Sequence, residues 1–357
     1  METGMEAVEP SAEGRAEEER AKRVVVKPRP LNAETPLEAL AQARTPTGSF
    51  FVRNNHPEPE LPATTHQIAV EGAVEVPFTL RLADLAQGPL HELTVTLECA
   101  GNGRTLMAPL PEGEPWGKGA LGTAVWKGVP LSLVLGRARL RPEVLEVLVE
   151  GADGEGSKRF ARSLPVSKAL HPDTLLALEM NGAPLTREHG APVRLIAPGW
   201  YGMAQVKWVR RIEALTRPFE GYYQRERYIY DRGDGQAPEP VTRMRVKSLI
   251  LSPASGTRVA PGRVVVQGLA WSGERRVVQV EVAVDAGETW KPATLLETPK
   301  PSAWVRWAFT WEDAAPGRHT LRARATDEAG ETQPEAAPWN RLGYGNNAVQ
   351  VHVVDVG

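Results

Sequence analysis

The chain of 357 residues contains a single cysteine, Cys99. One cysteine excludes an intrachain disulfide, and it also excludes zinc and iron–sulfur sites that need several thiolates. No apolar run approaches the about 20 residues that span a bilayer, so we expect no membrane segment. Acidic and basic residues nearly cancel, to a formal net charge of −2, which gives no reason to expect nucleic acid as a partner.

The N-terminus lacks both the apolar core of a signal peptide and a twin-arginine export motif. As written, the sequence therefore predicts a cytoplasmic protein, or a periplasmic one if a leader is missing. Residues 1–27 are rich in Glu, Lys and Arg. They offer few apolar groups to offset the entropy lost on ordering, so we predict a flexible tail there.

The length predicts about two domains after this tail, and the composition is that of a folded soluble protein. In residues 28–246, short strand-like runs such as 67–70 and 93–99 mix with short helical stretches at 130–135 and 167–170. Proline and glycine recur throughout and keep helices brief. We therefore expect an α+β fold with a mixed or antiparallel sheet rather than repeated βαβ units.

Residues 247–357 have a different pattern, in which apolar side chains alternate with polar ones. Turn residues interrupt these runs at intervals of roughly 10 residues, which is typical of a β-sandwich. Without a cysteine pair, the sandwich is expected to be immunoglobulin-like in topology only. The alternating residues are Val278, Val280, Val282 and Val284; Val305, Trp307, Phe309 and Trp311; and Leu321, Ala323 and Ala325.

Cys99 ends a strand-like run in which Leu93, Val95 and Leu97 alternate with polar residues. A period of two places Cys99 on the same face as these apolar side chains. Two glycines and an asparagine then turn the chain, and Arg104 follows. On this run alone, the pattern favours a buried and inert cysteine, because unpaired cysteines are among the most buried residue types.

Several separated motifs change this interpretation. Residues 98–104 (ECAGNGR), 51–56 (FVRNNH) and 150–153 (EGAD) are followed by the long stretch 177–208 (ALEMNGAPLTREHGAPVRLIAPGWYGMAQVKW) and by WNRLG at 339–343. Together they resemble the sulfite oxidase family. The resemblance implies a mixed α/β molybdopterin-binding domain, residues 28–246, followed by an immunoglobulin-like dimerisation domain, residues 247–357.

The resemblance also implies roles for individual residues. Cys99 would supply the thiolate ligand of a molybdenum–molybdopterin cofactor, a role that suits a soft sulfur donor. The implied catalytic residues are Arg53, Arg104 and Tyr228. The implied cofactor-binding residues are Phe51, Val52, Arg53, Asn54, Asn55, Asp153, His189, Arg194, Gln205, Val206 and Lys207.

The chain departs from the family pattern at three positions. The family's histidine after the FVRN segment falls on Asn55, with His56 one residue later. A lysine of the animal enzymes is replaced by Glu112, and the arginine of the terminal motif by Leu342, with Arg341 beside it. Two tryptophans of the family also have counterparts here, and ordinary core packing accounts for them equally well. These are Trp116 and Trp126.

The implied activity is the molybdopterin-dependent oxidation of sulfite or a related sulfur oxyanion to sulfate. Electrons would pass to an external acceptor, a cytochrome or oxygen, because the chain has neither cysteine clusters nor a preceding haem domain. We expect a homodimer and a small anionic substrate. The alternatives are oxo transfer with another substrate, such as nitrate or a sulfoxide, and a binding scaffold without catalysis.

Overall fold

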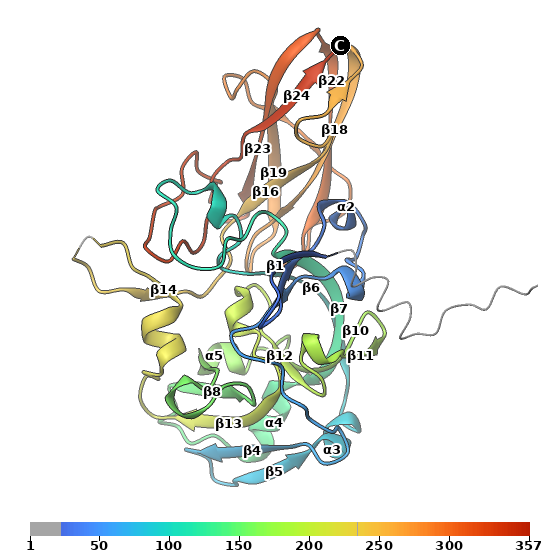
Figure 1. The fold of residues 1–357 in the computed structure, drawn as a ribbon. Coiled ribbons are helices and arrows are strands. Elements are labelled where there is room, and N and C mark those ends of the chain that lie inside the picture. Colours follow the sequence, from blue (N-terminus) through green and yellow to red (C-terminus); the bar gives the residue numbers. More distant parts are fainter. Residues whose placement is uncertain (1–22, 234) are drawn as a thin grey trace, which may run out of the picture.

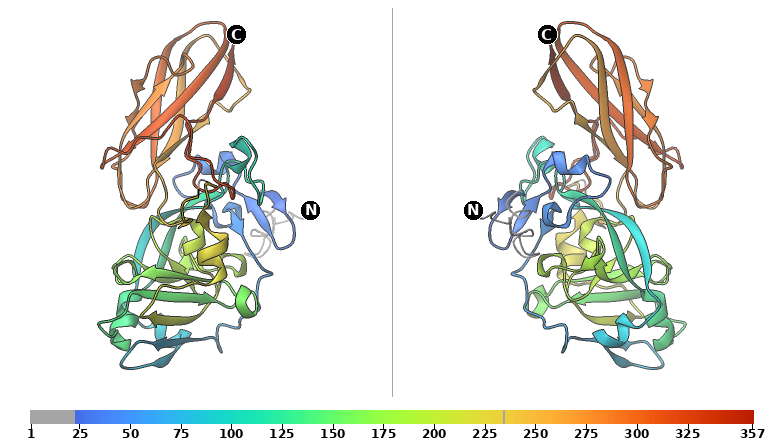
Figure 2. Two further views of the ribbon diagram at one scale, coloured as in Figure 1. Left: turned by 90° about the vertical axis from the view of Figure 1, so that its left-hand side faces the viewer. Right: turned by 90° about the vertical axis from the view of Figure 1, so that its right-hand side faces the viewer.

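The computed structural model describes residues 23–233 and 235–357. It has a lower lobe of small sheets with short helices and an upper lobe of long strands (Figure 1). Figure 2 shows the two lobes from the sides, stacked end to end. The predicted α+β fold followed by a β-sandwich is confirmed.

An antiparallel sheet of the lower lobe leads directly to Cys99. Its strands are, in order, β11 (Ala183–Pro184), β10 (Leu175–Met180), β7 (Leu121–Pro130) and β6 (His91–Glu98), and β12 (Arg194–Ile196) also pairs with β10. The backbone amide of Cys99 donates to the Ala120 carbonyl at 2.9 Å, which extends the β6–β7 ladder by one residue. The cysteine is therefore fixed at the edge where the strand becomes a loop.

A second sheet of the lower lobe is mixed. Its strands are β5 (Phe78–Arg81), β4 (Gln67–Gly72), β13 (Val209–Leu215), β8 (Glu146–Gly151) and β9 (Ala161–Pro165), with β4 and β13 parallel. Val209 at the start of β13 lies opposite Gly151 at the end of β8. This register brings Lys207, just before β13, to the same sheet edge as Asp153, just after β8.

A small antiparallel sheet sits beside these two. It consists of β1 (Val24–Lys27), β2 (Asn32–Glu34) and β3 (Val52–Arg53). Most of the predicted tail, residues 1–22, lies outside the described residues. Residues 24–27 differ from that prediction, because three consecutive valines favour a strand and β1 pairs with β2.

The helices are short, as the frequent prolines predict. The expected helices at 130–135 and 167–170 are present, and each begins directly after a proline. They are α4 (Leu131–Ala138) and α5 (Val166–Ala169), and the others are α2 (Leu37–Leu40) and α3 (Leu82–Ala86). In the described ranges, no helix has the length and apolar character to cross a membrane.

The upper lobe is a sandwich of two sheets. One contains β16 (Lys247–Ser252), β18 (Gly262–Trp271), β22 (Val305–Ala314) and β21 (Thr294–Leu295); the other contains β17 (Arg258–Val259), β24 (His352–Val356), β23 (Gly317–Asp327), β19 (Val277–Ala283) and β20 (Lys291–Pro292). Val280, Trp307 and Leu321 fill its core, as their alternation predicts. Val278 does not, because a register shift between Val277 and Gln279 turns Val277 inward and leaves Val278 53% exposed.

The end of β6 is buried on both faces, whereas its alternation predicts a half-buried strand. Thr96 and Glu98 face the upper lobe, which covers them. The Glu98 carboxylate accepts hydrogen bonds from Lys247 Nζ at 3.0 Å and Trp271 Nε1 at 2.9 Å. It also accepts one from Asn102 Nδ2, at 2.9 Å, in the loop that follows Cys99. One buried carboxylate thus joins the two lobes directly behind the cysteine.

The chain also returns from the upper lobe to this loop before entering β24. The backbone amide of Gly345 donates to the Ala100 carbonyl at 2.7 Å. The side-chain amide of Asn346 donates to the Gly103 carbonyl, also at 2.7 Å. Because buried carbonyl groups need hydrogen-bond donors, this returning segment completes the loop that carries Cys99.

Replacing Lys247 with methionine would leave the Glu98 carboxylate buried without its cation. We expect Lys247→Met to lower the free energy of unfolding by about 3–5 kcal/mol, measured by urea denaturation. The double variant Glu98→Gln/Lys247→Met removes both charges and should recover most of that loss. Arg81→Met, which breaks an exposed ion pair with Asp84, is the control and should have no measurable effect. Equal losses in the single and double variants would contradict the pairing.

Candidate active site

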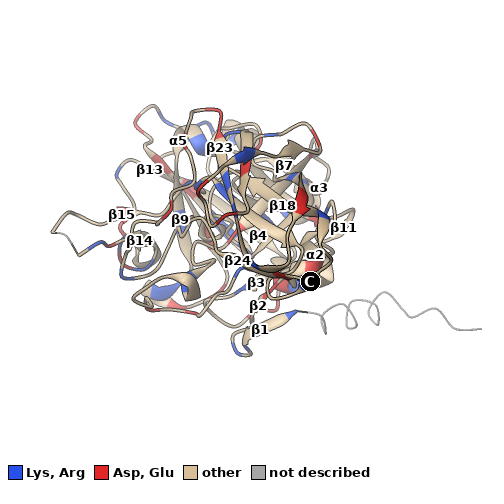
Figure 3. Ribbon diagram, turned by 90° about the horizontal axis from the view of Figure 1, so that it is seen from above, with Lys and Arg blue, Asp and Glu red and all other residues tan. Residues whose placement is uncertain are grey.

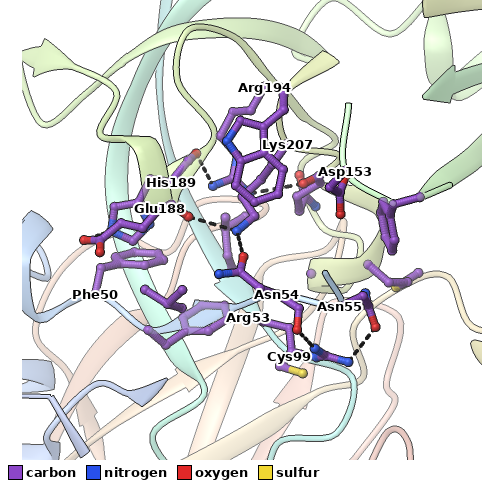
Figure 4. A pocket seen from close by; sticks show the side chains of 18 of the residues that line it. Phe50, Arg53, Asn54, Asn55, Cys99, Asp153, Glu188, His189, Arg194 and Lys207 are labelled. Atoms are coloured by element: carbon purple, nitrogen blue, oxygen red, sulfur yellow. Dashed lines mark hydrogen bonds and ion pairs between the residues drawn. The ribbon is translucent and has the colours of Figure 1, made fainter. Parts of the chain in front are cut away.

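A cavity lies at the edge where β3, the loop after β6 and the segment around residues 188–208 meet. Cys99 and Arg53 lie near one end, and Arg194 and Lys207 at the other (Figure 4). Most of the predicted site residues line it. They are Phe51, Val52, Arg53, Asn54, Asn55, Cys99, Asp153, His189, Arg194, Gln205, Lys207 and Tyr228.

One end of the cavity combines a thiol with a permanent cation. Cys99 is 5% exposed, and burial raises the pKa of its thiol, although Arg53 and the backbone amide of Gly101 oppose the rise. Burial likewise opposes the charge on Arg53, but Tyr228 and Cys99 raise its pKa above the ordinary value. The thiolate form and the guanidinium therefore stabilise each other.

Arg53 is held in place and still has donors to spare. Its guanidinium donates to Asn32 Oδ1 at 3.1 Å, to Asn55 Oδ1 at 2.7 Å and to the Asn54 carbonyl. These bonds use three of the five N–H groups of an arginine. Within the described residues the other two have no hydrogen-bond acceptor, so they are available to an anion in the cavity.

The opposite end is cationic. Arg194 donates to the carbonyls of His189 at 2.9 Å and Gln205 at 3.2 Å, while its buried Nε has no partner among the described residues. Lys207 Nζ donates to the Glu188 carbonyl at 2.9 Å and to Asn54 Oδ1. Burial lowers the pKa of Arg194 to about 9, and burial together with Arg194 lowers that of Lys207 to about 7. Both cations are thus held at a free-energy cost that an anion would relieve.

Asp153 contributes an acceptor to the same wall. Burial raises the pKa of its carboxyl to about 6, although the charge of Lys207 acts in the opposite direction. Its buried Oδ1 has no hydrogen-bond partner in the part of the chain that the structure describes. The side chain therefore offers a free acceptor to a ligand that carries N–H groups.

His189 and Gln205 line the cavity but bond to the protein itself. His189 Nε2 lies 3.1 Å from the Thr47 carbonyl, and burial lowers the pKa of the imidazole to about 3. Gln205 bonds to both backbone groups of Ala197, at 2.6 and 2.8 Å, and to the Trp200 carbonyl at 2.9 Å. These two side chains fix the shape of the wall.

Two predicted site residues do not line the cavity. Arg104 donates from Nε and Nη2 to the Leu342 carbonyl, at 3.0 and 2.9 Å, and from Nη1 to the Glu114 carbonyl at 2.6 Å. It fastens the returning segment to the Cys99 loop, so its position differs from the predicted contact with a substrate. Val206 is fully buried in the core, and its carbonyl accepts from the Leu195 amide at 2.7 Å.

Residues that the sequence did not reveal complete the site. Tyr228 follows a π-helical turn, Tyr223–Arg227, and buried Arg162 donates to the carbonyls of Tyr223 and Val241, the latter at 3.0 Å. Arg162 is a lone arginine in a strand, so the sequence contained no signal for it. Seven further residues line the cavity, of which four fall within the long motif at 177–208. They are Phe50, Leu97 and Phe160, and, within the motif, Glu188, Gly202, Met203 and Trp208.

Two of the three departures from the family pattern, Glu112 and Leu342, do not line the cavity. Arg341 is on the surface, where it pairs with Asp231 at 2.9 Å and Glu112 at 3.4 Å. The side chain of Leu342 is buried. Trp116 and Trp126 pack in the apolar cluster that contains Cys99, as core aromatics do.

The lowered pKa of His189 has a consequence for the cofactor-free protein. Between about pH 3 and pH 6.5 an unfolded histidine binds a proton that the buried one does not, so stability rises with pH across that window. His189→Asn should remove a slope of about 1.4 kcal/mol per pH unit from the free energy of unfolding, measured by denaturation at several pH values. A variant profile parallel to the wild-type profile would contradict a neutral, buried imidazole.

Comparison with known proteins identifies the two lobes. Residues 55–223 match the family model of the oxidoreductase molybdopterin binding domain, and residues 239–356 match that of the Mo-co oxidoreductase dimerisation domain. Mitochondrial sulfite oxidase of Rattus norvegicus is 37% identical over 350 residues, covering 91% of this chain and 64% of the rat protein. The chain thus spans slightly less than two thirds of that relative.

A solved structure and a nitrate reductase are also similar to this chain. The solved structure of the sulfane dehydrogenase SoxCD from Paracoccus pantotrophus superposes with a TM-score of 0.85 at 32% identity, covering 95% of this chain and 91% of that one. Nitrate reductase [NADH] of Solanum lycopersicum is 33% identical over 360 residues, covering 89% of this chain and 39% of that protein. On these matches, over both lobes, the chain belongs to the sulfite oxidase family of molybdopterin-dependent oxidoreductases.

Proposed function

We propose that this protein oxidises sulfite, or a related sulfur oxyanion, with a molybdopterin cofactor bound in the cavity. The observation that carries the proposal is the pairing of the Cys99 thiol with Arg53 at one end of a cavity whose other end is cationic. A thiolate is a soft ligand suited to molybdenum, and a guanidinium binds an oxyanion. The sulfite oxidases and the sulfane dehydrogenase among the relatives favour sulfur as the atom oxidised.

The residues of the cavity fit the cofactor. Molybdopterin carries a phosphate and a ring system rich in N–H groups and ring nitrogens. Arg194, which is buried, and Lys207, which is half-buried, are cations that suit the phosphate and the ring nitrogens. Arg194 Nε is a buried donor without a partner among the described residues. Asp153 Oδ1 is an equally unpartnered acceptor, within those same residues, for ring N–H groups. Cys99 would supply the protein's ligand to the metal.

The net reaction converts sulfite and water into sulfate, two protons and two electrons. When bound, the molybdenum cofactor supplies the transferred oxygen and takes up the two electrons. Arg53 would hold the anionic substrate through its two free N–H groups, because charge-assisted hydrogen bonds both bind and orient an oxyanion. Cys99 and Tyr228 at this end are buried and Arg53 is half-buried, and the low local dielectric strengthens that attraction.

The partners follow from the same proposal. The electrons leave to an external acceptor, a cytochrome or oxygen. The match of residues 239–356 to a dimerisation domain supports a homodimer. Seen from above, ribbon segments of Lys or Arg and of Asp or Glu are interspersed (Figure 3). A cytoplasmic location, or a periplasmic one with a leader, stays a prediction.

Nitrate is the second candidate substrate, because nitrate reductase is among the relatives. Nitrate carries a single negative charge, and Leu342 contributes no cation to the cavity. The same purified protein distinguishes the two, since sulfite gives up electrons to ferricyanide whereas nitrate takes them from a reduced dye. Turnover with nitrate alone would overturn the assignment to a sulfur oxyanion.

Cys99→Ser tests the metal ligand. We expect sulfite-dependent reduction of ferricyanide to fall below the detection limit, because a serine hydroxyl is a poor replacement for a soft thiolate. The circular dichroism spectrum should stay unchanged, since the substitution is nearly isosteric. Molybdenum content, measured by mass spectrometry, separates loss of the metal from loss of chemistry. Wild-type turnover in the variant would contradict ligation by Cys99.

Arg53→Met tests the anion site. Removing two charge-assisted hydrogen bonds should raise the KM for sulfite at least tenfold in the molybdenum-loaded enzyme. Arg341→Met is the matched control, because it removes a surface arginine that does not line the cavity, and its KM should equal the wild-type value. An unchanged KM in the Arg53 variant would exclude Arg53 from substrate binding.

A further inference from the structure

Asn55 lies between the two predicted catalytic side chains that line the cavity. Its Oδ1 accepts from Arg53 Nη2 at 2.7 Å (Figure 4). Its Nδ2 lies 3.1 Å from the Tyr228 hydroxyl. The sequence pattern assigns Asn55 to the cofactor, as the position where the family has a histidine. The structure instead places its side chain in hydrogen-bond contact with Arg53 and Tyr228.

Arg53 fixes which end of the amide faces Tyr228. An arginine has only donors, so the atom it contacts must be the amide oxygen. The NH₂ group of Asn55 then points at the tyrosine and has only protons to offer. The reverse bond, from the Tyr228 hydroxyl to Asn55 Oδ1, spans 3.4 Å, well beyond the usual length of an O–H···O hydrogen bond. The hydroxyl oxygen of Tyr228 therefore accepts from Asn55.

This leaves the proton of the Tyr228 hydroxyl available. No other hydrogen bond of this hydroxyl occurs within residues 23–233 and 235–357. Tyr228 is 3% exposed, so bulk water offers it little, and its side chain lines the same cavity as Cys99 and Arg53. A buried O–H group without an acceptor is costly, which favours an acceptor supplied by a ligand in the cavity.

We propose that Asn55 is a positioning residue that turns the Tyr228 O–H toward an oxygen atom of the bound sulfur oxyanion, beside the free N–H groups of Arg53. The inference rests on the proposed function and specifies how its substrate is held. Asn55 bonds to Arg53 and Tyr228 at once, so one amide aligns both donors. An amide does not titrate, and the direction of this hydrogen bond is therefore the same at every working pH.

Asn55→Asp reverses the bond with almost no change in shape. A carboxylate oxygen replaces the NH₂ group, accepts the Tyr228 proton and turns it away from the cavity. The test measures sulfate binding by calorimetry to molybdenum-loaded wild type, Tyr228→Phe, Asn55→Asp and the double variant. The added negative charge is present in both proteins that carry Asn55→Asp. It therefore cancels when the effect of Tyr228→Phe is compared between the wild-type and Asn55→Asp backgrounds.

We expect Tyr228→Phe to weaken sulfate binding about tenfold in the wild-type background and less than twofold in the Asn55→Asp background. Tyr222→Phe removes a nearby hydroxyl that does not line the cavity and should change neither background. Equal losses in the two backgrounds, or no loss in the first, would overturn the role of Asn55. If Asn55→Asp fails to fold, Asn55→Ala tests the same point. In the Asn55→Ala background we expect Tyr228→Phe to weaken sulfate binding less than threefold.

The same proteins separate this inference from the proposed function. Sulfite turnover by the wild type tests the function, whereas the sulfate comparison tests the direction of the Tyr228 bond. Turnover with equal losses in both backgrounds would overturn the inference alone. Sulfate binding with the expected coupling but no turnover would overturn the function alone. Absence of sulfate binding in the wild type would overturn the inference, because no oxyanion would then meet Tyr228.

Discussion

The buried carboxylate of Glu98 is the constraint on which the site depends. It lies next to Cys99 in the chain and points to the opposite face of the strand, where it accepts hydrogen bonds from both lobes. A charge buried this deeply is tolerated only with a full set of partners. The position of the cysteine is therefore tied to the docking of the upper lobe, and neither can shift without exposing an unpaired charge.

One end of the cavity carries more positive than negative charge. Arg194 is close enough to Lys207 to disfavour its proton, and burial disfavours the charge of both. Asp153 opposes these cations, but its own ionisation is disfavoured by burial. Such a cluster is preorganised for a polyanionic ligand, because the cost of assembling the cations is met during folding. The cofactor would thus stabilise the protein as well as bind to it.

The alternation of apolar and polar residues along the chain predicted which side chains of a strand face the core. The alternation around Val280, Trp307 and Leu321 identified the sandwich core, and the alternation before Cys99 identified the face on which the thiol lies. Contacts between distant segments were not predictable in this way. Glu98 looked like a solvent-facing residue because its partners in the upper lobe lie 149 and 173 residues away. The family resemblance implies a substrate role for Arg104, and the sequence gives no sign that its guanidinium bonds to the Leu342 carbonyl, 238 residues away.

The segment that returns from the upper lobe forms hydrogen bonds with the Cys99 loop, so this loop depends on a part of the chain that is synthesised much later. Gly345 and Asn346 supply donors to the carbonyls of the Cys99 loop, and Leu342 supplies the carbonyl that holds Arg104. The ribosome adds Leu342 to the chain 238 residues after Arg104, when most strands of the upper lobe have already been made. The full set of hydrogen bonds that holds the loop presenting the thiol therefore cannot form until the second lobe has been synthesised.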